Sequence, residues 1–185
     1  MENNPKSVNK VFFSYLIHPQ IKFETYEPGE KVILLLRAHP VTQLHWIINS
    51  IILFIVLFFI NFILPSFLLL NQIFVLNVFI LVFILSFIWY SFLNWYFNVG
   101  IITNKRVIDV DFHGILYKEV TVARLNKIED ITVKSGGYFA SLFDYGTVFT
   151  QTAGTEANVE FINIPFPSLV VQNINQLLGK KHGSQ

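Results

Sequence analysis

The 185-residue sequence has no cysteine, and it has few charged residues. The lack of cysteine excludes disulfide bonds, thiolate metal ligands and a cysteine nucleophile. Charged residues make up 14% of the chain, against about 25% in a typical soluble protein. The net charge of +1 argues against general binding of nucleic acid.

The missing charge is concentrated in one block, residues 38–104, which contains no Asp, Glu, Lys or Arg. From Trp46 to Phe97 this block is almost entirely Ile, Leu, Val and Phe. A soluble core would alternate apolar with polar residues, whereas a membrane-spanning helix needs about 20 apolar residues in a row. The block therefore predicts a membrane protein with two spans.

We predict the two spans at residues 44–64 and 73–93, with a break at Pro65 and a connecting turn through residues 70–72. The few polar residues inside the spans, such as Asn61 and Asn77, are expected to form hydrogen bonds between the helices. Neither span contains the mid-membrane charge that is usual in a transporter or pump, so neither function is favoured.

Basic residues predict the orientation in the membrane. Lys22, Lys31 and Arg37 precede the first span, Lys105 and Arg106 follow the second, and the connection between the spans has no basic residue. The positive-inside rule then places both termini in the cytoplasm, as in a multi-pass protein of the cell (cytoplasmic) membrane. Aromatic residues near the cytoplasmic ends of both spans fit an interfacial belt: Trp46, Trp89, Tyr90, Trp95 and Tyr96.

We divide the chain into an N-terminal cytoplasmic arm at residues 1–43, a transmembrane hairpin at 44–96 and a cytoplasmic domain at 97–185. The arm is long and mostly polar, so we expect no cleaved signal peptide. Within it, residues 11–17 are expected to lie on the domain or at the bilayer interface. Residues 31–37 are a buried strand or the start of a helix, and periodicity does not separate the two.

After the second span the pattern changes to the period of two that is typical of strands. Ile108, Val110 and Phe112 share one face, and Asp109 and Asp111 are predicted on an opposite, solvated face. Six short antiparallel strands are expected, at residues 99–102, 108–112, 115–122, 127–134, 146–152 and 158–164.

The chain ends in an amphipathic helix. Ser168 is its predicted N-cap, apolar residues follow at helical spacing, and Gly179 is predicted to end it. A single helix laid over a small open sheet would hide the exposed apolar surface. The predicted fold class is therefore membrane α + β: a two-helix transmembrane hairpin followed by a pleckstrin-homology-like (PH-like) antiparallel sheet or half-barrel, capped by a C-terminal helix.

The order and spacing of several short motifs resemble bacterial PH-like domain membrane proteins of the YdbS-like kind, which carry two transmembrane helices. The match runs from Glu27 onward. The segments that carry it are 27–32, 102–108, 119–120, 125–128, Gly137, 142–143, 146–148, 152–154 and 164–165. The resemblance implies a membrane-tethered interaction domain with no catalysis and no cofactor. It does not supply a ligand.

No pattern in the sequence supports a metal or catalytic site. The five histidines have no ligand spacing, and no nucleophile motif or phosphate-binding loop occurs. The candidate residues for binding a lipid headgroup or a partner are Lys105, Arg106, Arg124 and Lys127. Residues 105–185 contain equal numbers of basic and acidic residues, which argues against a strong phosphoinositide-type site.

Three functions remain open, and the favoured one is a membrane-anchored PH-like domain that scaffolds or binds protein partners at the cytoplasmic membrane face. A module that binds lipid headgroups is the alternative, and a membrane enzyme comes last. The expected partners are membrane lipids together with a second protein or another copy of this chain, with no nucleic acid and no small-molecule substrate. The sequence names neither the partner nor the process.

Overall fold

A computed structural model describes residues 14–19, 26–114, 117–154 and 157–182. Residues 1–10 of the predicted arm and the start of the predicted segment at 11–17 lie outside this part of the chain. Two compact units are present. One is the helical unit Gln43–Trp95, and the other, here called the sheet unit, contains the described residues up to Thr42 and from Tyr96 onward.

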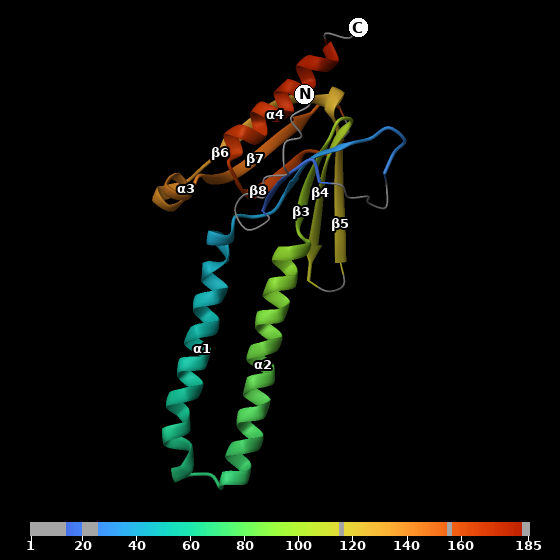
Figure 1. Cartoon of the computed structure of the whole chain (residues 1–185). Helices are drawn as coiled ribbons and strands as arrows, with labels where there is room; N and C mark the ends of the chain where they lie inside the picture. Colours follow the sequence, from blue (N-terminus) through green and yellow to red (C-terminus); the bar gives the residue numbers. More distant parts are fainter. Residues whose placement is uncertain (1–13, 20–25, 115–116, 155–156, 183–185) are drawn as a thin grey trace, which may run out of the picture. The chain divides into compact units, whose positions relative to one another are not determined.

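The helical unit is an antiparallel pair of long helices, α1 (Leu44–Ile63) and α2 (Leu70–Phe97), which lie side by side in Figure 1. Both are long and apolar enough to cross a membrane. The first agrees closely with the span predicted at residues 44–64. The second is longer at both ends than the predicted 73–93.

The predicted turn through residues 70–72 is wrong, because those residues form the first turn of α2. The side chain of Gln72 reaches back and accepts a hydrogen bond of 3.0 Å from the backbone N–H of Leu69. This is half of a capping box, so a polar residue that suggested a turn instead begins the helix. The chain reverses earlier, after the 3₁₀ helix η2 (Leu64–Ser66), which contains Pro65, the predicted break.

Asn61 and Asn77 join the two helices, as predicted from their positions. Asn61 Nδ2 donates to Asn77 Oδ1 at 3.1 Å, and Asn77 Nδ2 donates to Asn61 Oδ1 at 2.7 Å. A reciprocal amide pair of this kind satisfies polar groups on facing helices and fixes their register.

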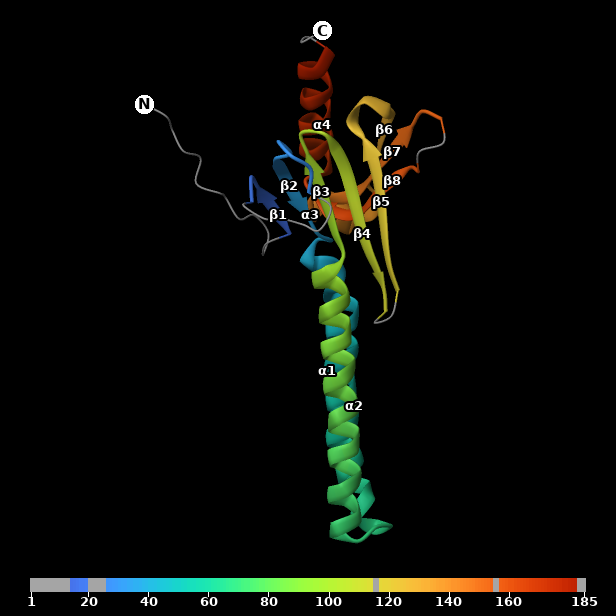
Figure 2. The ribbon, with the colours of Figure 1, turned by 90° about the vertical axis from the view of Figure 1, so that its right-hand side faces the viewer.

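The sheet unit contains a five-stranded antiparallel sheet in the order β1-β2-β3-β4-β5, seen in Figure 2. Two of its strands come from residues that the sequence analysis assigned to the arm at 1–43. The segment at 31–37 is thus a strand, and Leu34 of that segment pairs with Ile102. The strands are β1 (Tyr15–Ile17), β2 (Val32–Leu36), β3 (Val99–Thr103), β4 (Arg106–His113) and β5 (Tyr117–Arg124).

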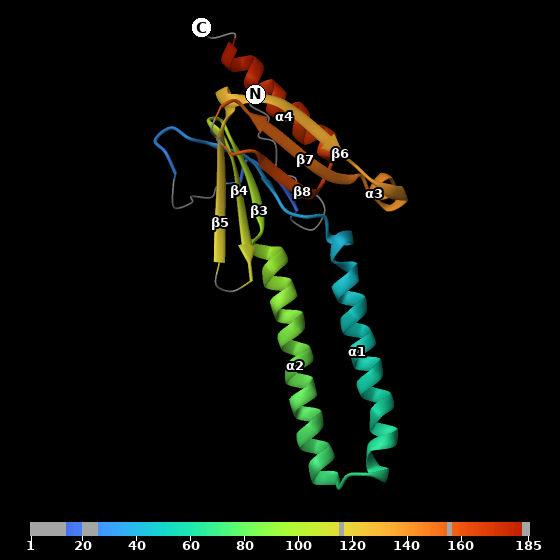
Figure 3. The same ribbon diagram turned by 180° about the vertical axis from the view of Figure 1, so that it is seen from behind.

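A second sheet of three antiparallel strands follows, β6 (Ile128–Lys134), β7 (Tyr145–Thr152) and β8 (Val159–Pro165), with the short helix α3 (Gly137–Phe143) between β6 and β7. The helix α4 (Pro167–His182) packs on β6 and β7, as Figure 3 shows from behind.

Both predicted ends of the C-terminal helix are wrong. Pro167 occupies the first helical position, where its missing N–H costs nothing, so Ser168 lies inside the first turn rather than at the N-cap. The helix also continues past Gly179. Glycine disfavours a helix interior by only about 1 kcal/mol, which packing of the helix on the sheet outweighs.

One hydrophobic core holds the sheet unit together. It lies between the two sheets and is closed by α4. The five-stranded sheet contributes Leu34 and Ile102, the three-stranded sheet contributes Phe161, and α4 contributes Val170 and Ile174, all of them buried. The expected architecture of an antiparallel sheet capped by a C-terminal helix is therefore present.

Candidate functional site

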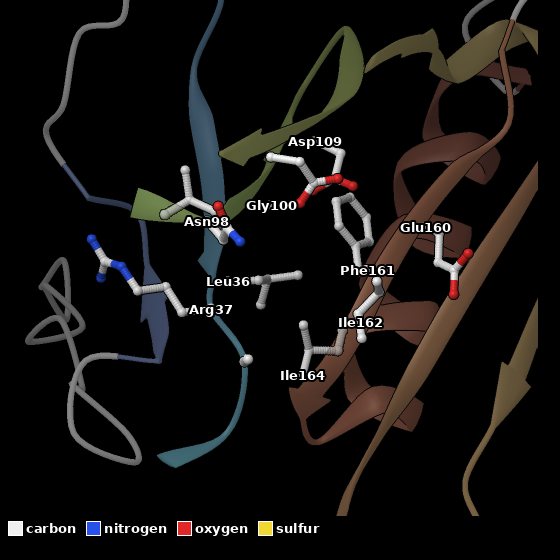
Figure 4. A pocket seen from close by; sticks show the side chains of 12 residues that line it. Leu36, Arg37, Asn98, Gly100, Asp109, Glu160, Phe161, Ile162 and Ile164 are labelled. Atoms are coloured by element: carbon white, nitrogen blue, oxygen red, sulfur yellow. The ribbon is translucent and has the colours of Figure 1, made fainter. Parts of the chain in front are cut away.

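The candidate site is a cavity of about 160 Å³ at the edge of the core, where β3 and β4 face β8 (Figure 4). Leu36, Phe161 and Ile164 supply apolar surface at its floor. Asp109, Asp111 and Glu160 supply carboxylates. We call this cavity the acidic cleft.

Glycine at position 100 brings the two sheets close together at the acidic cleft. A Cβ atom on Gly100 would lie 2.4 Å from Cδ1 of Phe161, which is closer than real Cβ atoms approach. The Phe161 ring therefore occupies the space above β3 that any side chain would fill. Gly100 pairs with Asp109 in the β3–β4 register, so the ring and the carboxylate become neighbours.

Asp109 does not lie on a solvated strand face, and that prediction is wrong. Val107, two residues earlier on the same strand, is fully buried in the core. Alternate residues of a strand share a face, so Asp109 and Asp111 lie on the same face of β4 as Val107, toward the end of the strand. The opposite face also carries apolar residues, because Ile108 packs with Val32 in a second, smaller cluster. With apolar residues on both faces, alternation alone could not say which face is wet.

The protein environment raises the pKa of Asp109 to about 8. Burial is the main cause, because it disfavours the charged form, and the nearby carboxylates of Asp111 and Glu160 add to the effect. A hydrogen bond with Asp111 also favours a proton on Asp109. The cleft thus holds a carboxyl that is mainly protonated at pH 7, beside two other carboxylates.

Arg37 lines the same cleft, but its guanidinium is directed away from the carboxylates (Figure 4). Its Nε donates a hydrogen bond of 2.9 Å to the backbone oxygen of Tyr96, and the guanidinium carbon lies 4.7 Å from the centre of the Tyr96 ring. Burial lowers the pKa of Arg37. The guanidinium of Arg37 therefore interacts with Tyr96 and points away from the carboxylates of the cleft.

The size and lining of the cleft limit what it can bind. Pockets for drug-sized ligands and cofactors have volumes of about 300–1,000 Å³. A volume of about 160 Å³ holds roughly five waters at about 30 Å³ each, or one long side chain. Carboxylates above an apolar floor suit a group with an alkyl stem and a cationic end, as in lysine or arginine. Over the described ranges no three His, Asp or Glu side chains are arranged to hold a metal ion.

The basic residues singled out in the sequence lie elsewhere in the sheet unit, and two of them are in ion pairs. Arg106 binds Glu30 through two hydrogen bonds of 3.0 Å, and Lys105 Nζ lies 3.3 Å from Glu27. Thr103 Oγ1 also donates to Glu30, at 2.8 Å.

These contacts place Glu30 in a closed network between the turn before β2 and the β3–β4 turn. Glu30 is completely buried, and the side chain of Arg106 is only 12% exposed. Burial by itself would raise the pKa of Glu30. The hydrogen bonds from Arg106, the Glu27 N–H and Thr103, with the charge of Arg106, outweigh burial and lower it.

Arg124 and Lys127 have exposed side chains and lie at and just after the end of β5. Arg124 pairs with Arg106 in the β4–β5 register, and Lys127 ends the 3₁₀ helix η3 (Leu125–Lys127). Lys105, Arg106 and Arg124 thus lie close together where β4 begins and β5 ends. Lys105 and Arg106, however, form ion pairs with Glu27 and Glu30.

The histidine that precedes α1 is not at a solvated interface. His39 is buried, its ring stacks on Tyr145 at a centroid distance of 5.6 Å, and its Nδ1 accepts a hydrogen bond from the Val41 N–H at 3.1 Å. Burial lowers the pKa of His39, so the neutral ring is favoured.

Comparison with known proteins gives three findings. The family described as "Bacterial PH domain" matches residues 48–178. A crystal structure of a DUF1696 family protein with a pleckstrin-homology domain, from Shewanella loihica PV-4, is similar with 17% sequence identity and a TM-score of 0.32. That similarity covers 45% of this chain and 68% of the other. No curated protein matches the sequence.

Proposed function

The chain belongs to the bacterial PH domain family, and from this premise we propose that it is a membrane-anchored interaction module that binds a protein partner through the acidic cleft. The module binds and does not catalyse. The proposal has two parts, the anchor and the binding site, and they rest on different observations.

The anchor is the helical unit. Its two helices are long and apolar enough to span a bilayer, and they contain no charged residue. The positive-inside rule, applied to basic residues on both sides of the pair such as Arg37 and Lys105, places the sheet unit in the cytoplasm. The protein is then a multi-pass protein of the cell membrane with both termini inside.

The acidic cleft is the observation that favours a protein as the partner. Carboxylates stand over an apolar floor in an opening too small for a cofactor, and a basic side chain of a partner fits both its size and its charge. Asp109 is itself protonated at pH 7, so the incoming cation would be held mainly by Asp111 and Glu160. Binding should tighten as Asp109 loses its proton near pH 8.

A lipid-headgroup function is the second candidate, and the ion pairs weaken it. A phosphate group would have to compete with Glu30 for Arg106 and with Glu27 for Lys105. Of the four candidate residues, Arg124 and Lys127 have exposed side chains and are not part of those two ion pairs. Two exposed cations would gain roughly 1 kcal/mol each from an anionic leaflet, which is too little for a specific site.

Site-specific photo-crosslinking of the full-length protein in native membranes tests the proposal. A crosslinking residue replaces Ile162, which lines the cleft and is exposed, and in a control protein it replaces the exposed Val133. We expect one discrete adduct from position 162 whose crosslinked peptide contains Lys or Arg. We expect that adduct to be lost when Asp111→Lys is added.

An adduct that survives Asp111→Lys, or that forms equally from position 133, would overturn the cleft as the binding site. An adduct between two copies of this chain would support the proposal and identify the partner as the protein itself. Anionic phospholipid that copurifies with the full-length protein, and that is lost in the Arg124→Glu, Lys127→Glu double variant, would instead establish the lipid-headgroup function.

A further inference from the structure

The helix α3 presents an unusually exposed apolar surface. Tyr138 is 96% exposed, Leu142 is 75% exposed and Phe139 is 69% exposed. We call these three residues the α3 patch. The helix Gly137–Phe143 contains no charged residue. Exposed apolar residues that are scattered singly need no explanation, but three on two turns of one helix indicate a contact.

We propose that the α3 patch is a third membrane contact of this protein, inserted into the interfacial layer of the bilayer that the two apolar helices cross. This inference rests on the proposed membrane anchor. It is independent of the acidic cleft, because the two surfaces share no residue.

The chemistry of the patch fits the interface between headgroups and acyl chains. Tyrosine and phenylalanine with a neighbouring leucine are the side chains that interfacial segments use, since a ring can be apolar on its body and polar at its tip. Ala140, on the opposite side of the helix, is buried and attaches α3 to the sheet unit.

The two ends of the segment are fixed, so the patch is held in place rather than carried on a loose loop. Ser135 Oγ donates a hydrogen bond of 2.9 Å to the Tyr145 oxygen across the base of the segment. Asp144 caps the helix in the left-handed region at φ 50°, and its N–H donates to the Ala140 oxygen. A rigid presentation lowers the entropy that insertion would cost.

The connectivity of the chain supports a location of α3 near the bilayer surface. Phe143, the last residue of α3, has its ring 6.3 Å from the ring of His39. The next residue after His39 begins the apolar stretch Pro40–Ser66, which is 27 residues long. At about 1.5 Å per residue this stretch is roughly 40 Å long, more than the ~30 Å hydrocarbon core, so its first residues lie at the headgroup level.

The distance from His39 to the far end of α3 is short. A seven-residue helix is about 10 Å long, so the far end of α3 is only about two helical turns from Phe143. The whole patch therefore lies within roughly 16 Å of His39, which directly precedes the apolar stretch.

The natural lack of cysteine makes a direct test possible. Single-cysteine variants of the full-length protein are reconstituted in phosphatidylcholine–phosphatidylglycerol vesicles and labelled with a polarity-sensitive fluorophore. Lipids with a spin label near the headgroup or deep in the acyl chain then quench it. The variants are Leu142→Cys in the patch, Phe58→Cys in the second half of α1 and Gln172→Cys on the exposed face of α4.

We expect the label at 142 to lose fluorescence with the shallow quencher more than with the deep one. We expect the opposite order at position 58 and no loss at 172. A label at 142 that behaves like the label at 172 overturns the inference, and so does one that is shielded from water but not quenched by either lipid, because another protein surface would then cover it. If the label at 58 is also unquenched, the membrane anchor itself fails, which separates the two failures.

Discussion

At the scale of single residues, Asp109 has the most altered chemistry in the described part of the chain. Its carboxyl is half-buried in a cleft that apolar residues and two other carboxylates also line, and Arg37 turns away from it to Tyr96. Its pKa is raised from 3.8 to about 8. A group of this kind costs stability whenever the unfolded chain would release its proton and the folded protein keeps it.

Replacement of Asp109 by Asn should therefore stabilise the protein in a pH-dependent way. The folded-state pKa lies above the unfolded value, so the stability of the natural protein falls as pH rises from about 4 to about 8 and then levels off. Asp109→Asn removes this loss, worth up to about 1.4 kcal/mol for each pH unit crossed. Thermal unfolding in detergent between pH 4 and pH 9 measures it.

The exposed Glu129→Gln variant is the matched control, since it removes a carboxylate of the same sheet unit outside the cleft. Because Glu129 is exposed, this variant should change the melting temperature much less than Asp109→Asn does at pH 8. A gain for Asp109→Asn that is as large at pH 4 as at pH 8 would contradict the raised pKa.

At the scale of elements, the network around Glu30 ties the start of β2 to the β3–β4 turn. Glu30 precedes the first apolar helix and Arg106 follows the second, yet two hydrogen bonds of 3.0 Å join them inside the sheet unit. A buried carboxylate is stable only while its partner is present. The network therefore holds together two segments that are far apart in the sequence.

Arg106→Ala should destabilise the sheet unit by about 3–5 kcal/mol, because it leaves Glu30 charged, buried and without its main partner. Lys105→Ala should cost less than about 1 kcal/mol, since the Lys105–Glu27 pair is exposed and screened by water. Chemical denaturation followed by circular dichroism compares the two variants. Equal losses would show that Arg106 acts only as a surface charge.

The same network predicts an acid limit. The pKa of Glu30 is lowered in the folded protein, so its stabilising contribution is complete above the ordinary value of 4.5 and is lost as pH falls through the lower, folded-state value. The difference in the free energy of unfolding between the natural protein and Arg106→Ala should therefore become smaller as the pH falls below 4.5.

At the scale of the whole molecule, the proposed orientation makes a prediction that does not depend on any binding site. Leu69 lies in the connection between α1 and α2, and Gln172 lies on α4 of the sheet unit. If both termini are cytoplasmic, these two positions are on opposite sides of the membrane.

In the natural cysteine-free chain, Leu69→Cys should react with a membrane-impermeant maleimide added outside a cell whose outer layers have been removed. Gln172→Cys should react only after the membrane is permeabilised. The reverse pattern would invert the topology, and reaction at both positions before permeabilisation would show that the chain does not span the membrane.

Features that depend on a local pattern could be predicted from the amino-acid sequence. The uncharged block at residues 38–104 predicted two long apolar helices, because their hydropathy is read along the chain and needs no partner. The alternation after residue 97 predicted strands, and the spacing of the motifs predicted the PH-like family.

Tertiary contacts were needed to establish which face of each strand is exposed to solvent and which charged residues form ion pairs. Asp109 alternates with Ile108 in the sequence, but the buried face of β4 is set by Phe161, which packs over Gly100 from another sheet. The sequence predicts that Arg106 is an exposed basic residue, whereas in the structure its side chain forms an ion pair with the buried Glu30. Both outcomes depend on contacts between segments that are far apart in the sequence, and the free energy of a charge depends on those neighbours rather than on its own sequence context.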